Sequence, residues 1–278
     1  MIETKADLHI HTTASDGKYT PEEVIALAAK AGLKAVSITD HDTYDGYFKA
    51  NAAGTDLGVE VITGIEITAD YNGRECHILG YGFETGNPEF KQFILAQKRR
   101  RYLRAKKMLA NLQKSGFDIS IDEIFAEYGT MNISRNHIAG LMVKKGFVTN
   151  TNDVFAKWLG NEGPAYFKIE YESAANVIKI IQNTGGVAVL AHPGLNFLTE
   201  DVEYFIGNGI NGIECIHPSH NYELQKRYRE ICLSNGLLET GGSDFHGYKS
   251  HDHVNFGTVV VDYSKAIQLK NGLAEVTN

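Results

Sequence analysis

The chain has 278 residues, of which 43% are hydrophobic, so it can bury the core of one large domain or of one domain with an insertion. Its 27 Lys and Arg against 34 Asp and Glu give a net charge of −7, which argues against broad electrostatic binding to nucleic acid or to an anionic membrane. The sequence has no signal-like amino terminus and no apolar run of the roughly 20 residues that span a bilayer. We therefore expect a soluble, cytoplasmic protein that does not associate with a membrane, and we predict no protein partner.

The amino-terminal third alternates strand-like and helix-like segments. KADLHI is strand-like, and TPEEVIALAAKAGL has the signals of a helix, with Thr20 as N-cap, Pro21 at the first position and Gly32 as the stop. KAVSITD predicts a second strand, and TYDGYFKANAAGTDLG predicts a second helix. EVITGIEITADYNGRECHILGYGF predicts two strands around the turn Asn72-Gly73. This alternation is typical of a parallel α/β fold.

The alternation stops between residues 87 and 168. This segment contains a long basic amphipathic helix, EFKQFILAQKRRRYLRAKKMLANLQKSG, and shorter helical stretches such as SRNHIAGLMVKKG, with Ser134 as the expected N-cap. Strand-like and helix-like segments then alternate again as far as LLETGGSDFHG. We therefore predict an α/β domain formed by residues 1–86 and 169–278, with an all-helical insertion at residues 87–168.

Histidines and acidic residues recur where the predicted strands end. The HxH spacing places His9 and His11 on the same face of the first strand. In a parallel α/β barrel the carboxyl ends of the strands converge on one mouth, even when they are far apart in sequence. Nine donors would then share one cavity, namely His9, His11, Asp16, His41, Glu66, His77, His192, Asp244 and His246. This donor set suits two or three divalent ions such as manganese, iron or zinc.

Other histidines and acids lie near these positions without joining the pattern. For Asp7, Asp40 and Asp42, orientation of the imidazoles and plain solvation or helix capping are equally good interpretations. His217 and His220 fall outside the nine positions and are expected to be rim or structural residues.

Six short motifs together resemble the PHP (polymerase and histidinol phosphatase) family of metal-dependent phosphoesterases. They are DLHIHTTASDG, ITDHDT, GIEI, CHILGY, AHPG and GGSDFHG. The resemblance runs from about residue 5 to about residue 250, and each of the nine expected ligand positions carries a suitable residue. It implies a distorted (β/α)7 TIM-like barrel with the helical insertion, and a trinuclear metal centre in the barrel.

The resemblance also implies how the ligands divide among three ions. One ion would be held by His9, His11, Glu66 and Asp244; Glu66 would bridge to a second ion held by His77 and His192; and the third would be held by Asp16, His41 and His246. The predicted catalytic residues are Asp16, Glu66, Asp244 and His246. The ions would lower the pKa of a bridging water, so that hydroxide serves as the nucleophile.

Basic residues in the insertion are candidates for substrate binding. Lys98, Arg101 and Arg104 recur every three residues and share one helix face, for which a solvated basic face is the simpler interpretation. Arg135 and His137 follow an expected N-cap, and both a helix start and a guanidinium suit phosphate. The segment also resembles the PHP branch that removes the 3'-phosphate from nucleoside 3',5'-bisphosphates and trims short RNA from its 5' end. We predict that the insertion is a substrate cap and that Arg101, Arg104, Arg135 and His137 contact the substrate.

The predicted protein is a metal-dependent phosphoric ester hydrolase that acts on a small nucleotide or a short oligonucleotide. The alternative is a phosphomonoesterase for another small metabolite, such as histidinol phosphate. A C–N bond hydrolase on a related metal barrel is disfavoured by the arginine-bearing insertion and by the absence of an evident bridging lysine in the motifs. A non-catalytic, metal-stabilised module is disfavoured because no ligand position lacks its residue.

Overall fold

The structure is a computed structural model that describes residues 4–270. These residues form two compact units. Unit 1 contains the described residues up to Gln92 and those from Glu172 onward, and unit 2 is Phe93–Tyr171. Within the described part of the chain, every helix is too short or too polar to cross a membrane.

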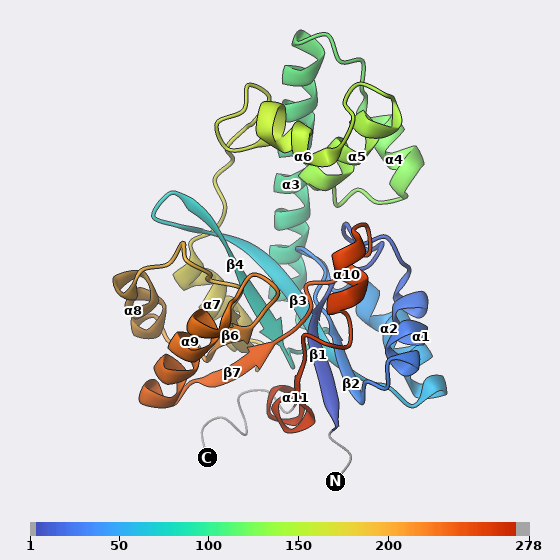
Figure 1. The fold of residues 1–278 in the computed structure, drawn as a ribbon. Helices are drawn as coiled ribbons and strands as arrows, with labels where there is room; N and C mark the ends of the chain where they lie inside the picture. Colours follow the sequence, from blue (N-terminus) through green and yellow to red (C-terminus); the bar gives the residue numbers. More distant parts are fainter. Residues whose placement is uncertain (1–3, 271–278) are drawn as a thin grey trace. The chain divides into compact units, whose positions relative to one another are not determined.

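Unit 1 is built around one sheet of eight strands that curls into a nearly closed barrel (Figure 1). The strand order is β7-β6-β5-β4-β3-β2-β1-β8. The strands are β1 (Lys5–Ile10), β2 (Ala35–Ile38), β3 (Glu60–Tyr71), β4 (Arg74–Tyr81), β5 (Val187–Leu190), β6 (Gly212–Ile216), β7 (Leu238–Gly241) and β8 (Val261–Asp262). The expected distorted α/β barrel is confirmed.

Strand direction is where the barrel departs from a regular parallel one. Neighbours pair in parallel from β1 to β3 and from β5 to β7, but β4 runs antiparallel to both β3 and β5. The predicted turn at Asn72-Gly73 explains this, because two residues can join antiparallel strands but cannot make the crossover that a parallel pair needs. The expected count of seven strands omitted β8, a strand of two residues that pairs antiparallel with β1.

The barrel closes where the segment after β7 reaches β1. The backbone N–H of His11 donates to the carbonyl oxygen of Phe245 over 2.9 Å. Gly242 permits this approach, since a Cβ at that position would lie 2.3 Å from the backbone nitrogen of His9. The glycine pair of GGSDFHG thus lets the backbone after β7 come close to the end of β1.

Helices surround the barrel of unit 1. They are α1 (Pro21–Lys30), α2 (Asp45–Leu57), α7 (Ala174–Gln182), α8 (Thr199–Gly207), α9 (Tyr222–Asn235), α10 (Ser250–Asn255) and α11 (Tyr263–Lys270). The predicted start of α1 is confirmed, with a capping box between Thr20 and Glu23. Buried side chains such as Ile10 and Ile38 from the sheet and Val24 and Ile25 from α1 form one core cluster. The strands are therefore held at fixed positions by apolar packing behind them.

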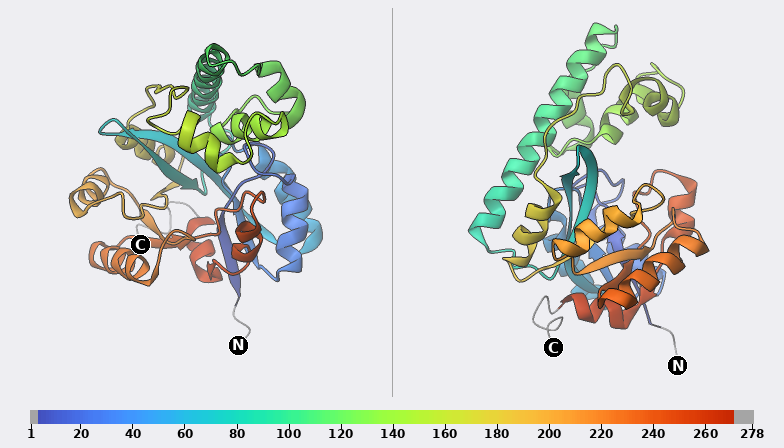
Figure 2. Two further views of the ribbon diagram at one scale, coloured as in Figure 1. Left: turned by 45° about the horizontal axis from the view of Figure 1, so that its top comes forward. Right: turned by 90° about the vertical axis from the view of Figure 1, so that its left-hand side faces the viewer.

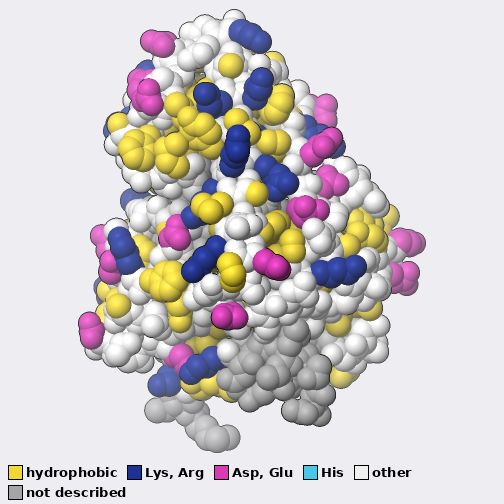
Figure 3. Space-filling model, turned by 180° about the vertical axis from the view of Figure 1, so that it is seen from behind, with side chains coloured by type: hydrophobic (Ala, Val, Ile, Leu, Met, Phe, Trp, Pro, Cys, Tyr) yellow, Lys and Arg dark blue, Asp and Glu magenta, His cyan; other side chains and the backbone are white. Residues whose placement is uncertain are grey.

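Unit 2 is helical and has its own core. Its helices are α3 (Pro88–Lys114), which begins in unit 1, then α4 (Ile121–Tyr128), α5 (Arg135–Lys144), α6 (Thr151–Val154) and the π-helical turn Phe155–Leu159. The shorter helices gather along one side of α3 (Figure 2). Leu112, Ile124, Met142 and Leu159 belong to one buried cluster that joins them. On the face of the molecule in Figure 3, Lys and Arg side chains are interspersed with acidic and hydrophobic ones, as the composition suggests.

Candidate metal centre

The nine predicted metal ligands come from one end of the strands in unit 1. His9 lies in β1, Glu66 lies in β3, and His77 lies in the first half of β4. Because β4 runs antiparallel to its neighbours, its first half lies at the same end of the sheet as the carboxyl ends of the parallel strands. The other six follow β1, β2, β5 and β7, namely His11, Asp16, His41, His192, Asp244 and His246.

The carboxylate of Glu66 lies at the middle of this group. Its Oε1 is 2.9 Å from Nδ1 of His77 and 2.9 Å from Nε2 of His192. Its Oε2 is 2.9 Å from Nδ1 of His41 and 3.3 and 3.5 Å from Nε2 of His11 and His9, respectively. One buried carboxylate therefore faces five imidazoles, a position from which it can bridge ions.

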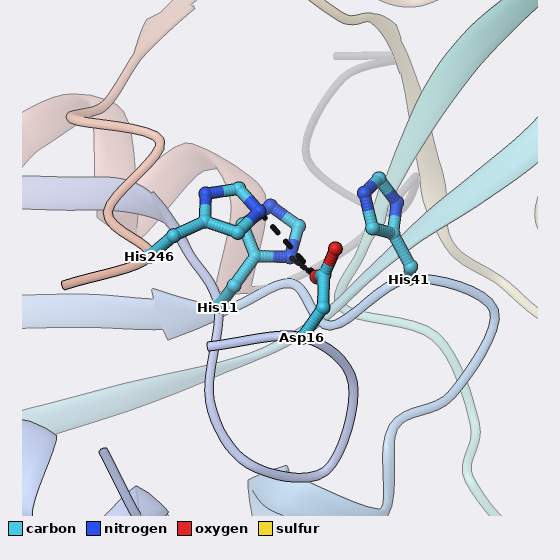
Figure 4. A group of neighbouring side chains, drawn as sticks. All are labelled: His11, Asp16, His41 and His246. Carbon is cyan, nitrogen blue, oxygen red and sulfur yellow. Dashed lines mark ion pairs between the residues drawn. The ribbon is translucent and has the colours of Figure 1, made fainter. Parts of the chain in front are cut away.

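Asp16 is the acid of a second group, which lies on the side of His11 and His246. Its Oδ1 is 3.8 Å from Nδ1 of His11 and 3.4 Å from Nε2 of His246. Figure 4 shows these two rings stacked on one side of Asp16 and His41 on the other, and the ring centroids of His11 and His246 are 4.1 Å apart. Ligand atoms of these four residues all lie within 4.8 Å of one another.

Asp244, which follows β7, lies beside the two histidines of the HxH motif. Its Oδ1 is 3.1 Å from Nε2 of His11 and 3.5 Å from Nε2 of His9. Together the nine residues form four overlapping groups whose ligand atoms lie within 4.8 Å of one another: His11, Asp16, His41 and His246; His9, His11 and Asp244; His9, Glu66 and His192; and His41, Glu66 and His77. The structure thus brings all nine predicted ligands together.

The electrostatics of the group reflect dense packing of imidazoles and acids. Burial raises the pKa of a carboxyl group, but the surrounding histidines hold the pKa values of Glu66, Asp16 and Asp244 well below their usual range. Burial lowers the pKa of an imidazole, and the Glu66 carboxylate reverses this for His77, whose pKa rises to about 10. Burial and the neighbouring His246 lower the pKa of His11 to about 3. The carboxylates are therefore ionised and attract positive charge to the centre.

The donor set and its unmet hydrogen-bonding capacity both fit divalent metal ions. Within the described part of the chain, Nε2 of His9, both ring nitrogens of His11 and Oε2 of Glu66 are buried and have no hydrogen-bond partner. Buried polar atoms of this kind are costly unless a ligand meets them. Imidazole and carboxylate donors suit manganese, iron and zinc, so these residues fit such ions.

The three neighbouring acids hold the backbone around the ligands. Asp40 accepts hydrogen bonds from the backbone N–H of Thr12 (2.7 Å) and from the hydroxyl of Ser15, in the loop that carries Asp16. Asp42 accepts from the backbone N–H of Thr68 over 2.9 Å, and Asp7 accepts from that of Ser243 over 2.9 Å. Each acid thus ties a strand end or loop to its neighbour. The three acids are fully buried and accept from strands and loops, so solvation and helix capping do not describe them, and none of these contacts is to an imidazole ring.

Backbone strain also concentrates in this region. The non-glycine residues with positive φ between 4 and 270 are Asp42 (49°), Asn72 (50°), His192 (25°) and Asp244 (49°). Asn72 lies in the hairpin turn, whereas the other three are ligand candidates or their neighbours. Such conformations cost of order 1–3 kcal/mol each and persist where the surrounding structure enforces them.

Sequence reasoning missed Glu214. This residue lies in β6 and is fully buried. Its Oε1 is 2.9 Å from Nδ1 of His9, and its Oε2 accepts the backbone N–H of His192 over 2.8 Å. The available signal was a lone acidic residue inside the apolar strand GIECI, where a buried charge needs a partner.

His217 and His220 were expected to be rim or structural residues. Nε2 of His217 lies 3.4 Å from Oδ2 of Asp244, so this ring borders the ligand group. His220 is buried, and its Nε2 accepts the backbone N–H of Gly194 over 3.0 Å. His220 therefore has the expected structural role, and His217 lies closer to the centre than a rim residue.

Arg101 and Arg104 of α3 are not part of a solvated basic face. Arg101 and Arg104 are each 7% exposed, which contradicts the simpler interpretation of the sequence. Within unit 2, Nη1 of Arg104 donates to the hydroxyl of Tyr171 over 2.9 Å, and its guanidinium lies 5.4 Å from the ring centroid of Tyr166. Helical spacing identified the face correctly, but the aromatic residues that cover it lie far along the chain.

Arg135 and His137 occupy the first turn of α5, where the sequence predicts them. Nη1 of Arg135 donates to Oδ1 of Asn161 over 3.2 Å, and its guanidinium lies 5.8 Å from the ring centroid of Tyr166. His137 is buried, and its Nδ1 accepts the backbone N–H of Ser134 over 3.2 Å as part of a capping box. Contact of these residues with a substrate stays a prediction.

Similar proteins hydrolyse phosphate esters. A phosphoribosyl 1,2-cyclic phosphate 1,2-diphosphodiesterase from Eggerthella lenta is 32% identical over 92% of this chain and 98% of its own length. A 5'-3' exoribonuclease from Haemophilus influenzae is 32% identical (87% and 90%), and a 3',5'-nucleoside bisphosphate phosphatase from Chromobacterium violaceum is 31% identical (86% and 86%). A crystal structure from Bifidobacterium adolescentis, described as a metal-dependent phosphoesterase, has a TM-score of 0.88 at 31% identity and covers 96% of each chain.

The region that matches a known protein family also contains most of the ligand candidates at the strand ends. The model of the PHP domain matches residues 7–185, which include six of the nine ligand candidates. The relatives and the solved structure extend the similarity over the remainder of the barrel, including Asp244 and His246. The chain therefore belongs to the PHP domain family and is a metal-dependent phosphoesterase.

Proposed function

We propose that the nine strand-end residues hold two or three divalent ions and that the enzyme hydrolyses a phosphate ester of a small nucleotide. The observation that carries this proposal is the carboxylate of Glu66, which faces five imidazoles while Asp16 and Asp244 lie among the same rings. A single ion cannot use nine donors, because such ions take about four to six ligands. Manganese, iron and zinc are the ions that this donor set suits.

The chain's own groups have separate tasks in this reaction. Bound ions would supply a hydroxide nucleophile near neutral pH and offset the charge on the phosphoryl oxygens. Asp16, Glu66, Asp244 and His246 are the proposed catalytic residues, and each belongs to at least one of the groups whose ligand atoms lie within 4.8 Å of one another. The buried carboxylates attract cations to these groups, and bound cations would in turn attract the phosphate.

The proposed substrate is a nucleoside 3',5'-bisphosphate, from which the 3'-phosphate is removed, or a short RNA that is trimmed from its 5' end. Two relatives support it, namely the 3',5'-nucleoside bisphosphate phosphatase from C. violaceum and the 5'-3' exoribonuclease from H. influenzae. Unit 2 supports it as well, since Arg104 and Arg135 both lie over the ring of Tyr166 and present two guanidiniums from one helical unit. Guanidiniums are suited to a phosphate that is not being cleaved. In this proposal residues 87–168 form the substrate cap.

A second candidate is hydrolysis of a cyclic phosphate diester on a sugar phosphate. The E. lenta relative favours it, because the match spans 98% of that protein. No observation favours the histidinol phosphate alternative.

A substrate screen with the metal-reconstituted enzyme tests the proposal. The panel contains adenosine 3',5'-bisphosphate, AMP, a short 5'-phosphorylated RNA, phosphoribosyl 1,2-cyclic phosphate and histidinol phosphate. We expect the highest kcat/KM for the bisphosphate or the RNA, and no phosphate release from a Glu66→Ala preparation purified in the same way. Preference for the cyclic phosphate would select the second candidate, and preference for histidinol phosphate would overturn both.

A further inference from the structure

Glu214 uses both of its carboxylate oxygens on the metal centre. Oε1 lies 2.9 Å from Nδ1 of His9, and Oε2 accepts the backbone N–H of His192 over 2.8 Å. The side chains of Glu214 and His9 are fully buried. Two ligand candidates from different strands, β1 and β5, therefore meet on one residue of β6.

The contact with His9 sets which ring nitrogen can bind an ion. An ionised carboxylate only accepts hydrogen bonds, so Nδ1 of His9 carries the proton and donates to Oε1. Nε2 then presents its lone pair. That nitrogen lies 3.5 Å from Oε2 of Glu66 and 3.5 Å from Oδ1 of Asp244, inside the ligand group.

The contact with His192 holds a strained backbone. His192 has a φ of 25°, a value that L-residues rarely adopt. The hydrogen bond from its backbone N–H to Glu214 fixes this conformation, and Nε2 of the same residue lies 2.9 Å from Oε1 of Glu66. His9, Glu66 and His192 form one of the groups whose ligand atoms lie within 4.8 Å of one another. Glu214 thus touches two of that group's three members.

We propose that Glu214 is a positioning residue that fixes the tautomer of His9 and the backbone of His192, and so sets the affinity of the ion held with Glu66. The proposal rests on the proposed function in that it takes these residues as ligands. Carboxylates behind a ligating imidazole commonly contribute 10- to 100-fold to metal affinity. Here one carboxylate supports two ligands, so the same range is expected.

The variant Glu214→Gln separates this role from simple packing. The amide has the same size but only one acceptor oxygen, whereas two N–H donors converge on Glu214. Either His9 must change tautomer or the His192 N–H loses its partner. The matched control is Glu239→Gln on the neighbouring strand β7, where Oε1 of Glu239 accepts from Nε of Arg229.

Metal binding to the full chain, freed of ions by chelation, is the first readout. Calorimetric titration with Mn²⁺ and elemental analysis after dialysis should show an affinity about 10- to 100-fold weaker for Glu214→Gln at one or two sites. The site around Asp16, His41 and His246 should keep its ion, since that group contains neither supported ligand. Glu239→Gln should match the wild type. Equal Mn²⁺ affinity in Glu214→Gln and wild type would overturn the proposal.

Nuclear magnetic resonance of the wild-type histidine rings is the second readout, and it does not depend on the variant's folding. With ¹⁵N-labelled, Zn²⁺-loaded protein, His9 should show a proton on Nδ1 that exchanges slowly with water. A proton on Nε2 of His9 would contradict the proposal. A wild type that binds no ion would instead refute the proposed function, so the two failures are distinguishable.

Discussion

Unit 1 and unit 2 hold their charged residues in opposite ways. In unit 1, buried acids face imidazoles, and atoms such as Nε2 of His9 have no hydrogen-bond partner in the described chain. In unit 2, the guanidiniums of Arg104 and Arg135 lie over aromatic rings and donate to neighbouring oxygens. The barrel therefore gathers buried acids and imidazoles that could hold cations, whereas the insertion holds buried and half-buried guanidiniums against its own aromatic rings.

Backbone strain follows the same division. Asp42, His192 and Asp244 adopt positive φ in unit 1, but in residues 93–171, all of which the structure describes, positive φ occurs at glycines alone. Strained positions persist where the fold enforces them, and they concentrate at functional sites. The strained positions of unit 1 thus lie among the ligand candidates, and recognition by unit 2 is a separate proposal.

The largest effect should come from removing the central carboxylate. Glu66→Ala is expected to lower kcat/KM at least about 10³-fold, since bridged ions contribute several kcal/mol of transition-state stabilisation. Phosphate release and metal content measure this loss. Glu60→Ala, at the other end of the same strand, should retain both, because Glu60 contacts Tyr263 outside the centre. Activity of Glu66→Ala near the wild-type level would show that the buried acids of unit 1 are not needed for the reaction, which contradicts the contrast drawn between the two units.

Metal removal should destabilise the two units unequally. Ions present at 100 times their Kd stabilise a folded state by about 2.7 kcal/mol, so chelation should lower the Tm by roughly 5–10 °C. Hydrogen exchange followed by mass spectrometry locates the change. Faster exchange is expected in peptides that contain His9, His77 and His192, with little change in residues 93–171. Equal loss of protection in both units would contradict this prediction, because it would show that the ions stabilise unit 2 as much as unit 1.

The barrel was largely predictable because its site depends on where strands end. Apolar runs such as VAVL and the turn Asn72-Gly73 mark those ends in the sequence, and parallel strands bring them to one mouth. The geometry then places all nine donors together. Their ligand roles stay predictions. A barrel of parallel strands alone does not explain the position of His77. This residue lies at the ligand end of the sheet because β4 runs antiparallel to its neighbours.

What could not be predicted depends on contacts between distant residues. Glu214 looks like any acidic residue in a strand until β6 is placed behind His9, 205 residues earlier in the chain. The spacing of Arg104 identifies a helix face, but its burial depends on Phe167 and Tyr171, 63 and 67 residues later. Helical periodicity tells which residues share a face and does not tell what covers it.

Arg135 gives the next largest effect and tests whether unit 2 supplies recognition. Arg135→Ala should remove a charge-assisted contact of roughly 1.5–3 kcal/mol, and kcat/KM for adenosine 3',5'-bisphosphate should fall about 10- to 150-fold. Turnover of p-nitrophenyl phosphate should change little, because this substrate has no second phosphate. Metal content should stay the same, and the exposed Arg99 serves as the control through Arg99→Ala.

Two outcomes would change this assignment. Equal losses on both substrates would place Arg135 on the reacting phosphate, and no loss on either would leave it with a structural role beside Asn161.

The smallest effect should come from the caps of unit 2, and it separates stability from recognition. Ser134 accepts the backbone N–H groups of Asn136 and His137 at the start of α5, and Ser120 accepts that of Glu123 at the start of α4. Either serine changed to alanine should cost about 1 kcal/mol and lower the Tm by a few degrees, measured by calorimetry. Ser134→Ala should also raise KM for the bisphosphate, because α5 begins with Arg135. Ser120→Ala should leave KM unchanged, since α4 carries no predicted substrate contact. If both variants raise KM equally, unit 2 acts on the substrate through its overall stability and not through the start of α5.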